Sequence, residues 1–265
     1  MYDFHYHRPK TLADAVNLLK GKDEARPMSG GMTLIPTLKQ RLARPTDVVD
    51  LSGIKELAGI KVEGNNVVIG GMTRHADVAS SAEIKAAIPA LAHLANHIGD
   101  PAVRNRGTIG GSVANNDPAA DYPAALLALN ATIATNKREL KADAFFKGLF
   151  ETALQDGEII IRISFPVPAK FAYAKFPNPA SRYAMVGVAV AQVGSEARVA
   201  VTGAGSNGVF RHTAMEAALG KGWSADALKG LAGNASQMIS DIHGDAAYRA
   251  HLVGVMARRA VAAAG

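Results

Sequence analysis

Hydrophobic residues recur along this chain at two spacings: every second residue in some segments, as in strands, and every third or fourth residue in others, as in helices. Tyr2, Phe4 and Tyr6 alternate with polar residues and predict a strand, and Thr11 resembles the N-cap of an amphipathic helix that ends at Gly21. The same patterns predict strands at 47–52, 131–136, 185–193 and 196–203, a hairpin at 60–71, and helices at 34–42, 76–80, 84–98, 122–130, 213–219, 225–238 and 247–263. The mixture predicts an α+β fold.

The chain has no internal repeat and no low-complexity linker, but two breaks in the pattern suggest where it divides. They lie near Gly59 and at 166–170. A length of 265 residues has room for one large domain or for two to three small ones. We therefore expect three parts, formed by residues 1–59, 60–170 and 171–265.

The composition excludes several classes of function. The chain has no cysteine, which excludes disulfides, cysteine catalysis and iron–sulfur clusters ligated by its own cysteines. Its net charge of +6 comes from scattered Lys and Arg residues, whereas a nucleic-acid binder gathers such charge in a stripe. No apolar run reaches the length of a membrane span, and the N-terminal residues lack the apolar region of a secretory signal. We expect no nucleic-acid partner, no transmembrane segment and no secretory signal.

Two glycine-rich segments carry the most specific chemistry. One contains Ser29–Leu34, and the other runs from Arg104 to Asp121 and includes Gly110 and Gly111. Glycines leave backbone N–H groups unshielded, so an anionic group can approach them closely. Asp117 and Asp121 lie beyond the second glycine pair, where a carboxylate can accept a hydrogen bond from a ribose or ring hydroxyl. The pair of segments predicts a large phosphorylated cofactor whose pyrophosphate is gripped from two sides.

Other motifs have both a functional and a structural interpretation. Gly203–Gly208 matches a dinucleotide-binding fingerprint, but no convincing second strand of a βαβ unit follows, which favours a plain glycine-rich connection. His5 and His7 share one face of a predicted strand, as metal ligands would, yet no third ligand is near and solvent-facing side chains are favoured. Asp241 is interpreted as a helix-capping residue, and Trp223 as packing between C-terminal helices. No Gly-x-Ser-x-Gly elbow supports a hydrolase triad.

The two glycine-rich segments resemble the FAD-binding loops of a known family. SGGMTLIP (29–36) and RNRGTIGGSVANNDPAADYPA (104–124) are similar to those of the medium, flavin-carrying subunit of molybdenum hydroxylases. This family includes the carbon monoxide dehydrogenase medium subunit and the flavin domain of xanthine dehydrogenase. Residues 145–166 and 240–261 resemble further stretches of the same family, so that the similarity covers the whole chain.

The resemblance implies a two-subdomain FAD-binding fold of the vanillyl-alcohol-oxidase (PCMH) type plus a C-terminal α+β domain. Residues 1–59 and 60–170 would form the two FAD subdomains, and 171–265 the C-terminal domain. Both glycine segments would offer backbone donors to the pyrophosphate, while Lys175 would lie near the flavin and stabilise its reduced, anionic ring. Arg104 and Arg106 would add positive potential or form surface ion pairs. The implied FAD-binding residues are Ser29, Gly30, Gly31, Met32, Thr33, Leu34, Ile98, Thr108, Ile109, Gly110, Gly111, Ser112, Asp117, Asp121, Ile160 and Lys175.

The resemblance also implies a function. The chain would be the FAD-binding electron-transfer subunit of a heterotrimeric molybdenum hydroxylase. It would take electrons from two-iron two-sulfur clusters in a small partner subunit, which receives them from the molybdenum cofactor of a large partner subunit. A dimer of heterotrimers and a cytoplasmic location are implied, with attachment to the inner face of the membrane through partners as an alternative. Two other interpretations stay open: a self-contained FAD-dependent oxidoreductase of the same fold superfamily, and a Rossmann protein that binds NAD(P) through Gly203–Gly208.

Overall fold

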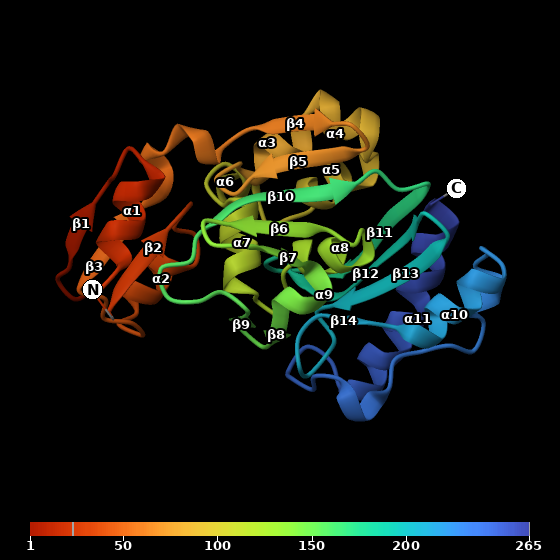
Figure 1. The fold of residues 1–265 in the computed structure, drawn as a ribbon. Coiled ribbons are helices and arrows are strands. Elements are labelled where there is room, and N and C mark those ends of the chain that lie inside the picture. The colour runs from red at the N-terminus through yellow and green to blue at the C-terminus, as the bar shows by residue number, and fades with distance from the viewer. Residues whose placement is uncertain (23, 265) are drawn as a thin grey trace.

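The computed structural model describes residues 1–22 and 24–264, which form three sheet-based units arranged along the chain (Figure 1). The N-terminal unit contains a parallel sheet of order β1-β3-β2, and the middle unit an antiparallel sheet of order β4-β5-β10-β6-β7. The C-terminal unit contains an antiparallel sheet of order β11-β12-β13-β14. Each unit contributes to a hydrophobic cluster, and the clusters of the middle and C-terminal units meet at the β11–β13 sheet.

The N-terminal unit alternates strands and helices. Thr11 caps α1 as predicted, because its hydroxyl accepts a hydrogen bond from the N–H of Asp14. Ala15 and Leu19 of this helix are buried, and they pack with the central strand of the sheet. The elements are β1 (His5–His7), α1 (Leu12–Leu19), β2 (Ala25–Met28), α2 (Leu34–Lys39), β3 (Asp47–Asp50) and two 3₁₀ turns (Leu51–Gly53 and Lys55–Leu57).

The middle unit places small helices around its antiparallel sheet. The predicted hairpin forms, with β4 and β5 paired from Ile60↔Ile69 to Glu63↔Asn66. The elements are β4 (Ile60–Glu63), β5 (Asn66–Gly70), α3 (His75–Ser80), α4 (Ala82–Ala87), α5 (Pro89–Asn96), α6 (Pro101–Arg104), α7 (Ile109–Asn115), α8 (Tyr122–Ala128), β6 (Thr132–Thr135), β7 (Glu139–Lys141), α9 (Ala142–Phe145), β8 (Phe146–Gly148), β9 (Glu151–Thr152) and β10 (Ile160–Pro166).

The C-terminal unit is a sheet whose two faces are both covered. Helix α11 packs on β11 and β12, helix α10 packs on β13, and helix α8 of the middle unit packs against β12 and β13. The elements are β11 (Lys170–Pro177), β12 (Ala184–Val193), β13 (Glu196–Thr202), β14 (Phe210–Arg211), α10 (Thr213–Lys221), two 3₁₀ turns (Asp226–Leu228 and Ala235–Gln237) and α11 (Ala246–Ala263).

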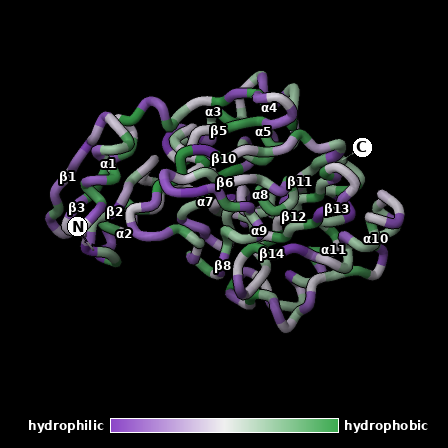
Figure 2. Tube along the Cα trace, viewed as in Figure 1, coloured by the Kyte–Doolittle hydropathy of each residue, from purple (hydrophilic) through white to green (hydrophobic). Residues whose placement is uncertain are grey.

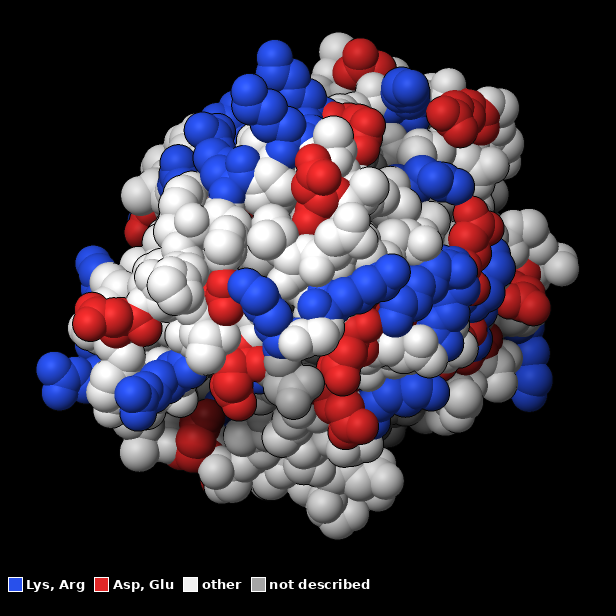
Figure 3. Space-filling model, turned by 60° about the vertical axis from the view of Figure 1, so that its left-hand side comes forward, with Lys and Arg blue, Asp and Glu red and all other residues white. Residues whose placement is uncertain are grey.

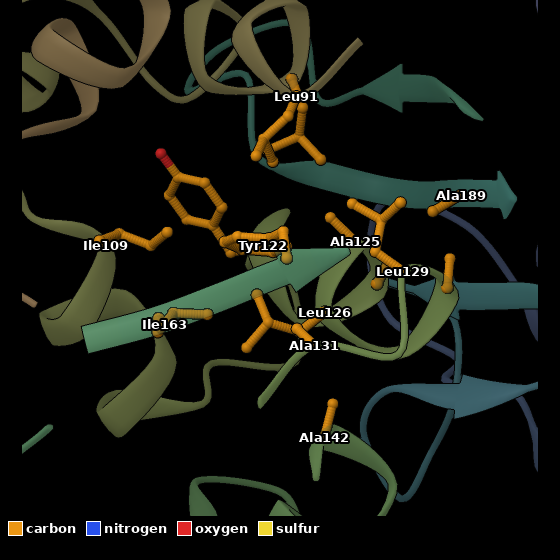
Figure 4. Packing of buried hydrophobic residues seen from close by; sticks show 14 of the residues in the cluster. Leu91, Ile109, Tyr122, Ala125, Leu126, Leu129, Ala131, Ala142, Ile163 and Ala189 are labelled. Atoms are coloured by element: carbon orange, nitrogen blue, oxygen red, sulfur yellow. The ribbon is translucent and has the colours of Figure 1, made fainter. Parts of the chain in front are cut away.

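Strand β12 places alternate side chains on the two faces of the C-terminal sheet. Successive side chains of a strand point to opposite faces, and here Val188 and Val190 belong to the cluster under α11 while Ala189 and Ala191 belong to the cluster around α8. Figure 2 shows β12 as an apolar strand within the molecule. The small alanines leave room for α8, whose residues are all buried, and Figure 4 shows Ala125 and Leu129 of this region close to Ala189. One strand thereby joins the middle and C-terminal units.

Several predicted elements are shorter or divided. The predicted helix at 84–98 breaks at Ile88, because Pro89 has no N–H and disfavours a helical conformation in the residue before it. The predicted helix at 225–238 is wrong: two 3₁₀ turns form there, separated by a turn at Gly230, whose φ is +77°. The N-terminal strand is limited to His5–His7, and the helix predicted at 34–42 ends at Lys39.

The alternative motifs find structural explanations. Gly203–Gly208 connects antiparallel strands β13 and β14, so the parallel βαβ unit of a Rossmann site is absent from this part of the described chain. The His7 Nε2 atom lies 2.6 Å from a carboxylate oxygen of Asp47. The Trp223 indole packs against the C-terminal core, which includes residues of α10 and α11, and Lys170 Nζ lies 5.5 Å from its ring centroid.

Charged side chains are mixed on the surface. On the face in Figure 3, Lys and Arg lie in several groups separated by acidic and neutral residues, so the net charge of +6 does not form one continuous stripe there. In the described part of the chain, no helix has both the length and the apolar composition needed to cross a bilayer.

A buried arginine fastens α11 to its sheet. Arg249 is 2% exposed and donates hydrogen bonds to the carbonyl oxygens of Met185 and Gly203 and to the Asp241 carboxylate. Asp241 is therefore an ion-pair partner and does not cap the helix; Asp245 does, by accepting a hydrogen bond from the N–H of Tyr248.

We predict that Asp241→Ala destabilises the protein by about 1–3 kcal/mol, because it leaves the buried Arg249 charge without its carboxylate. Urea unfolding would measure the change. The matched control is Asp226→Ala, since Asp226 forms a fully surface-exposed pair with Lys229 and its loss should cost less than about 0.5 kcal/mol. Equal effects of the two substitutions would contradict this account of Arg249.

Candidate functional site

A cavity of about 1030 Å³ lies where the three units meet. Its walls come from the loop after β2, from α6 and α7 with their flanking residues, and from the start of β10, and Ser181 and Tyr183 of the C-terminal unit also line it. The structure brings into this cavity every residue of the predicted site except Ile109 and Lys175. Its size is at the upper end of ordinary ligand pockets, which are roughly 300–1,000 Å³.

The first glycine segment presents a run of free backbone donors. No hydrogen bond between described residues uses the backbone N–H groups of Ser29–Leu34, and all six of these residues line the cavity. Gly31 has a φ of +74°, a conformation that other residues rarely adopt, and it turns the chain from β2 into α2. Consecutive N–H groups that converge on one cavity form an anion-binding nest.

The second glycine segment has a different structure from the one predicted. Thr108 caps α7, and the two glycines form the first turn of that helix, not an open loop. The N–H groups of Ile109 and Gly110 donate to the carbonyl oxygens of Thr73 and Gly71, at 3.0 and 2.8 Å. Those of Gly111 and Ser112 donate to Thr108, one to the hydroxyl and one to the carbonyl. Each of these four N–H groups thus has a partner within the protein, and donation from them to a ligand stays a prediction.

The glycines of the two segments permit close contact between them. A Cβ atom on Gly30 would lie 1.9 Å from the carbonyl oxygen of Arg106, and a Cβ atom on Gly111 would lie 3.4 Å from Cβ of Ser29. The two segments are therefore neighbours in one site, although residues 35–103 lie between them in sequence. Gly110 has another neighbour, since its Cβ would lie 2.5 Å from the carbonyl oxygen of Gly71.

Asp121 lines the cavity as the start of a buried polar network. Its carboxylate accepts hydrogen bonds from the Tyr173 hydroxyl and, at 3.0 Å, from Lys175 Nζ. Burial raises the pKa of Asp121, and the Lys175 ammonium and the Tyr173 hydroxyl oppose that change. Lys175 also donates to the carbonyl oxygen of His97 at 2.9 Å. Lys175 is not among the residues that line the cavity, and its ammonium contacts Asp121, so its place near the flavin stays a prediction.

The remaining predicted residues divide between lining and support. Ile98, Asp117 and Ile160 line the cavity, whereas Ile109 is fully buried in the core of the middle unit. Arg104 forms no ion pair with another described residue: its guanidinium donates to the carbonyl oxygens of Ile98 and Gly99 at 3.1 and 3.3 Å. It holds the backbone of a cavity wall in place.

Sequence reasoning missed several lining residues, among them Gly71, His75, Glu158 and Tyr183. Gly71 belongs to a third glycine pair, Gly70-Gly71, at the end of the predicted hairpin. This pair was a signal that another backbone segment packs closely there, as α7 does at Gly110. The other residues lie in segments with no glycine or phosphate-binding pattern. They reach the cavity only because the fold brings their segments to it.

Glu158 stiffens the wall that carries Ile159 and Ile160. Burial alone would raise the pKa of Glu158, but hydrogen bonds from Arg138, Thr135 and the N–H of Gln155 outweigh it and lower the pKa to about 2. The carboxylate is therefore ionised and anchored at neutral pH.

These residues fit a ligand with several negative charges and a large apolar part. Burying a pyrophosphate needs several donors at once, and the free N–H groups of Ser29–Leu34 supply them. Apolar side chains such as Ile98, Leu154 and Ile160 line the rest of the cavity. An α+β chain with such a cavity is typical of dinucleotide-binding flavoproteins.

Comparison with known proteins narrows this class. Residues 2–168 match the family described as FAD binding domain in molybdopterin dehydrogenase, and residues 171–264 match the CO dehydrogenase flavoprotein C-terminal domain. The carbon monoxide dehydrogenase medium chain of Hydrogenophaga pseudoflava is 37% identical over 98% of this chain and 96% of its own length. The glyceraldehyde dehydrogenase medium chain of Sulfolobus acidocaldarius is 38% identical over 97% of each chain.

Solved structures agree. Carbon monoxide dehydrogenase from Hydrogenophaga pseudoflava matches with a TM-score of 0.89 and 35% identity, covering 99% of this chain and 97% of that one. Reconstituted CO dehydrogenase from Oligotropha carboxidovorans matches with a TM-score of 0.91 and 36% identity, covering 99% and 98%. The chain belongs to the family of FAD-binding flavoprotein medium subunits of molybdenum-dependent dehydrogenases. The predicted family, and an α+β FAD-binding domain followed by a C-terminal domain, are confirmed.

The two glycines of α7 should respond differently to the same substitution. We predict that Gly111→Val strongly lowers FAD content while the melting temperature stays near wild type, because Gly111 faces Ser29 and the cavity. Gly110→Val should lower the melting temperature itself, because its side chain would collide with the Gly71 backbone. Flavin absorbance and thermal unfolding would separate the two effects. Full flavin occupancy in folded Gly111→Val protein would contradict the site.

A second prediction concerns acid. Glu158 has a pKa of about 2 in the folded protein, below its ordinary value of 4.5, so its contribution to stability is present above pH 4.5 and is lost as the pH falls from 4.5 toward 2. The free energy of unfolding of the wild-type protein should therefore fall more steeply over this range than that of Glu158→Gln. Urea unfolding at several pH values would measure both slopes, and parallel slopes would show that the carboxylate does not stabilise the fold.

Proposed function

We propose that this chain is the FAD-binding electron-transfer subunit of a heterotrimeric molybdenum hydroxylase. It accepts electrons from two-iron two-sulfur clusters in a small partner subunit, which is supplied by a molybdenum cofactor in a large partner subunit. It then passes the electrons to an external acceptor. The observation that carries the proposal is the run of free N–H groups at Ser29–Leu34 inside a cavity of dinucleotide size.

Backbone groups and side chains bind different parts of the cofactor. The N–H groups of Ser29–Leu34 bind the pyrophosphate without any cost in side-chain entropy, because glycine-rich backbone carries the donors. Ser112, Asp117 and Asp121 present polar groups from the opposite wall. Ile98 and Ile160 pack against the apolar part and exclude water from it.

Asp121, Tyr173 and Lys175 form a prearranged charge group at the cavity wall. Tyr173 has a pKa well above its usual value, through burial and the nearby carboxylate, so it stays a hydrogen-bond donor to Asp121. Lys175 balances the charge of Asp121 and orients it. Asp121 is therefore the residue that meets the ligand, and Lys175 acts on the ligand through Asp121.

Bound FAD supplies a redox carrier that takes up electrons singly and releases them in pairs. The chain itself has no cysteine for an iron–sulfur cluster. This supports a role for partner subunits in the steps before the flavin. The relatives named above are medium chains, and this chain matches them over nearly their full length. We therefore propose a large and a small partner subunit, a dimer of heterotrimers, and a cytoplasmic location.

A self-contained FAD-dependent oxidoreductase of the same fold superfamily is the second candidate. Its supporting observation is the cavity itself, which serves a free-standing flavoenzyme as well as a subunit. The proposals differ in what the isolated chain can do: a subunit binds FAD but oxidises no substrate without its partners.

We predict that the purified chain is yellow, releases FAD on denaturation and regains its flavin spectrum when the apoprotein is incubated with FAD. Expressed together with the genes for a large and a small subunit, a tagged chain should co-purify with both, and metal analysis of the complex should give iron and molybdenum. The chain purified alone is the control and should contain neither metal.

Colourless protein that takes up no FAD would contradict the cofactor assignment. A yellow chain that oxidises a substrate without partners would instead establish the self-contained enzyme.

A further inference from the structure

His75 is a buried polar residue of the cavity that the functions assigned so far do not use. It begins α3, is 4% exposed and lines the cavity. Neither ring nitrogen has a hydrogen-bond partner among the described residues, and Nδ1 is fully enclosed. Because an enclosed atom cannot reach a ligand, Nε2 is the nitrogen that can. A buried polar group without a partner is costly, and it indicates a missing ligand.

The Nε2 edge of the ring lies directly under the contact between the two glycine segments. A Cβ atom on Gly107 would lie 2.6 Å from His75 Nε2, and a Cβ atom on Gly30 would lie 2.8 Å from Cα of Gly107. The imidazole, Gly107 and the nest of Ser29–Leu34 are therefore stacked on one another. Because neither glycine carries a side chain, His75 and Gly30 both pack against Gly107. His75 Nε2 therefore lies close to the segment Ser29–Leu34, which carries the free N–H groups.

The first turn of α7 has no free backbone donor among its described residues. Its backbone N–H groups at 109–112 are spent on Thr73, Gly71 and Thr108, so that an anion gripped from this side needs side-chain donors. His75 has the right chemistry. Burial, reinforced by the nearby Arg104 charge, lowers its pKa to about 4, so the ring is neutral and has one N–H to donate.

We propose that His75 binds the FAD pyrophosphate by donating a hydrogen bond from Nε2–H to a phosphate oxygen. This inference rests on the proposed function, since it needs FAD in the cavity. Phosphate oxygens only accept hydrogen bonds, so they select the tautomer with the proton on Nε2. The pyrophosphate is then held by backbone donors on the β2–α2 side and by a neutral side chain on the α3–α7 side.

The test is the affinity of full-length apoprotein for FAD and for ADP, which carries the pyrophosphate but no flavin. A hydrogen bond to a charged group corresponds to a change of about 10- to 100-fold in affinity. We expect His75→Leu to weaken both ligands by that factor, measured by flavin fluorescence for FAD and by calorimetry for ADP. His75→Gln, whose amide nitrogen reaches about as far as Nε2, should recover most of the loss.

Tyr122→Phe is the matched control. The Tyr122 hydroxyl is the other enclosed and unpartnered group of this region, with its ring centroid 5.4 Å from that of His75, but Tyr122 does not line the cavity. Figure 4 shows its hydroxyl pointing away from the aliphatic cluster around Leu126. This variant should bind FAD and ADP like the wild type. The His75→Leu apoprotein should melt no lower than wild type, because it removes unpaired buried polar atoms.

Three results would overturn the proposal while the wild-type protein binds FAD. The first is that His75→Leu binds FAD and ADP with unchanged affinity. The second is that His75→Leu loses affinity for FAD but not for ADP. The third is that His75→Gln and His75→Leu both bind weakly and that their apoproteins melt at a lower temperature than wild type. Wild-type protein that binds no FAD would instead refute the proposed function.

Discussion

The contact between two backbone segments at Gly30 is the constraint on which the site depends. Gly30 lies against the carbonyl oxygen of Arg106 so closely that no Cβ atom fits between them. Through this contact the loop after β2 and the segment before α7 form adjoining walls of one cavity. Any side chain at position 30 would push the N-terminal unit away from the middle unit and open the site. The glycines are therefore needed for the packing of the two units as well as for access to the ligand.

The C-terminal unit completes the site by fixing its acidic side. Thr202 donates a hydrogen bond to the carbonyl oxygens of Pro118 and Ala120, and Tyr173 and Lys175 hold the Asp121 carboxylate. Strands of this unit thus grip the chain immediately before α8 from its outer side. A substitution in the C-terminal sheet would therefore shift residues of the cavity wall, although most of that sheet packs in a separate hydrophobic cluster.

The local structure could be predicted from the sequence where a rule that acts over a few residues determines it. The hairpin at 60–71, the Thr11 cap and the two glycine segments follow from turn, capping and steric rules that act over a few residues. The helix break at Ile88 was also readable, since Pro89 marks it. His75 and Lys175 could not be placed in this way, because their roles depend on contacts with segments 32 and 54 residues away, Gly107 and Asp121.

Helix α7 shows that a glycine pair alone does not predict free backbone donors. A glycine pair in sequence indicates exposed N–H groups, but the same pair after Thr108 suits the first turn of a capped helix, whose donors turn to the cap and to the neighbouring Gly71 backbone. The two glycine pairs are alike in composition and opposite in use: one leaves its N–H groups free for an anion, and the other spends them on the fold. Side chains that line the cavity on the α7 side, Ser112 and His75 among them, can supply donors in place of the backbone, and the proposed contact of His75 is of this kind.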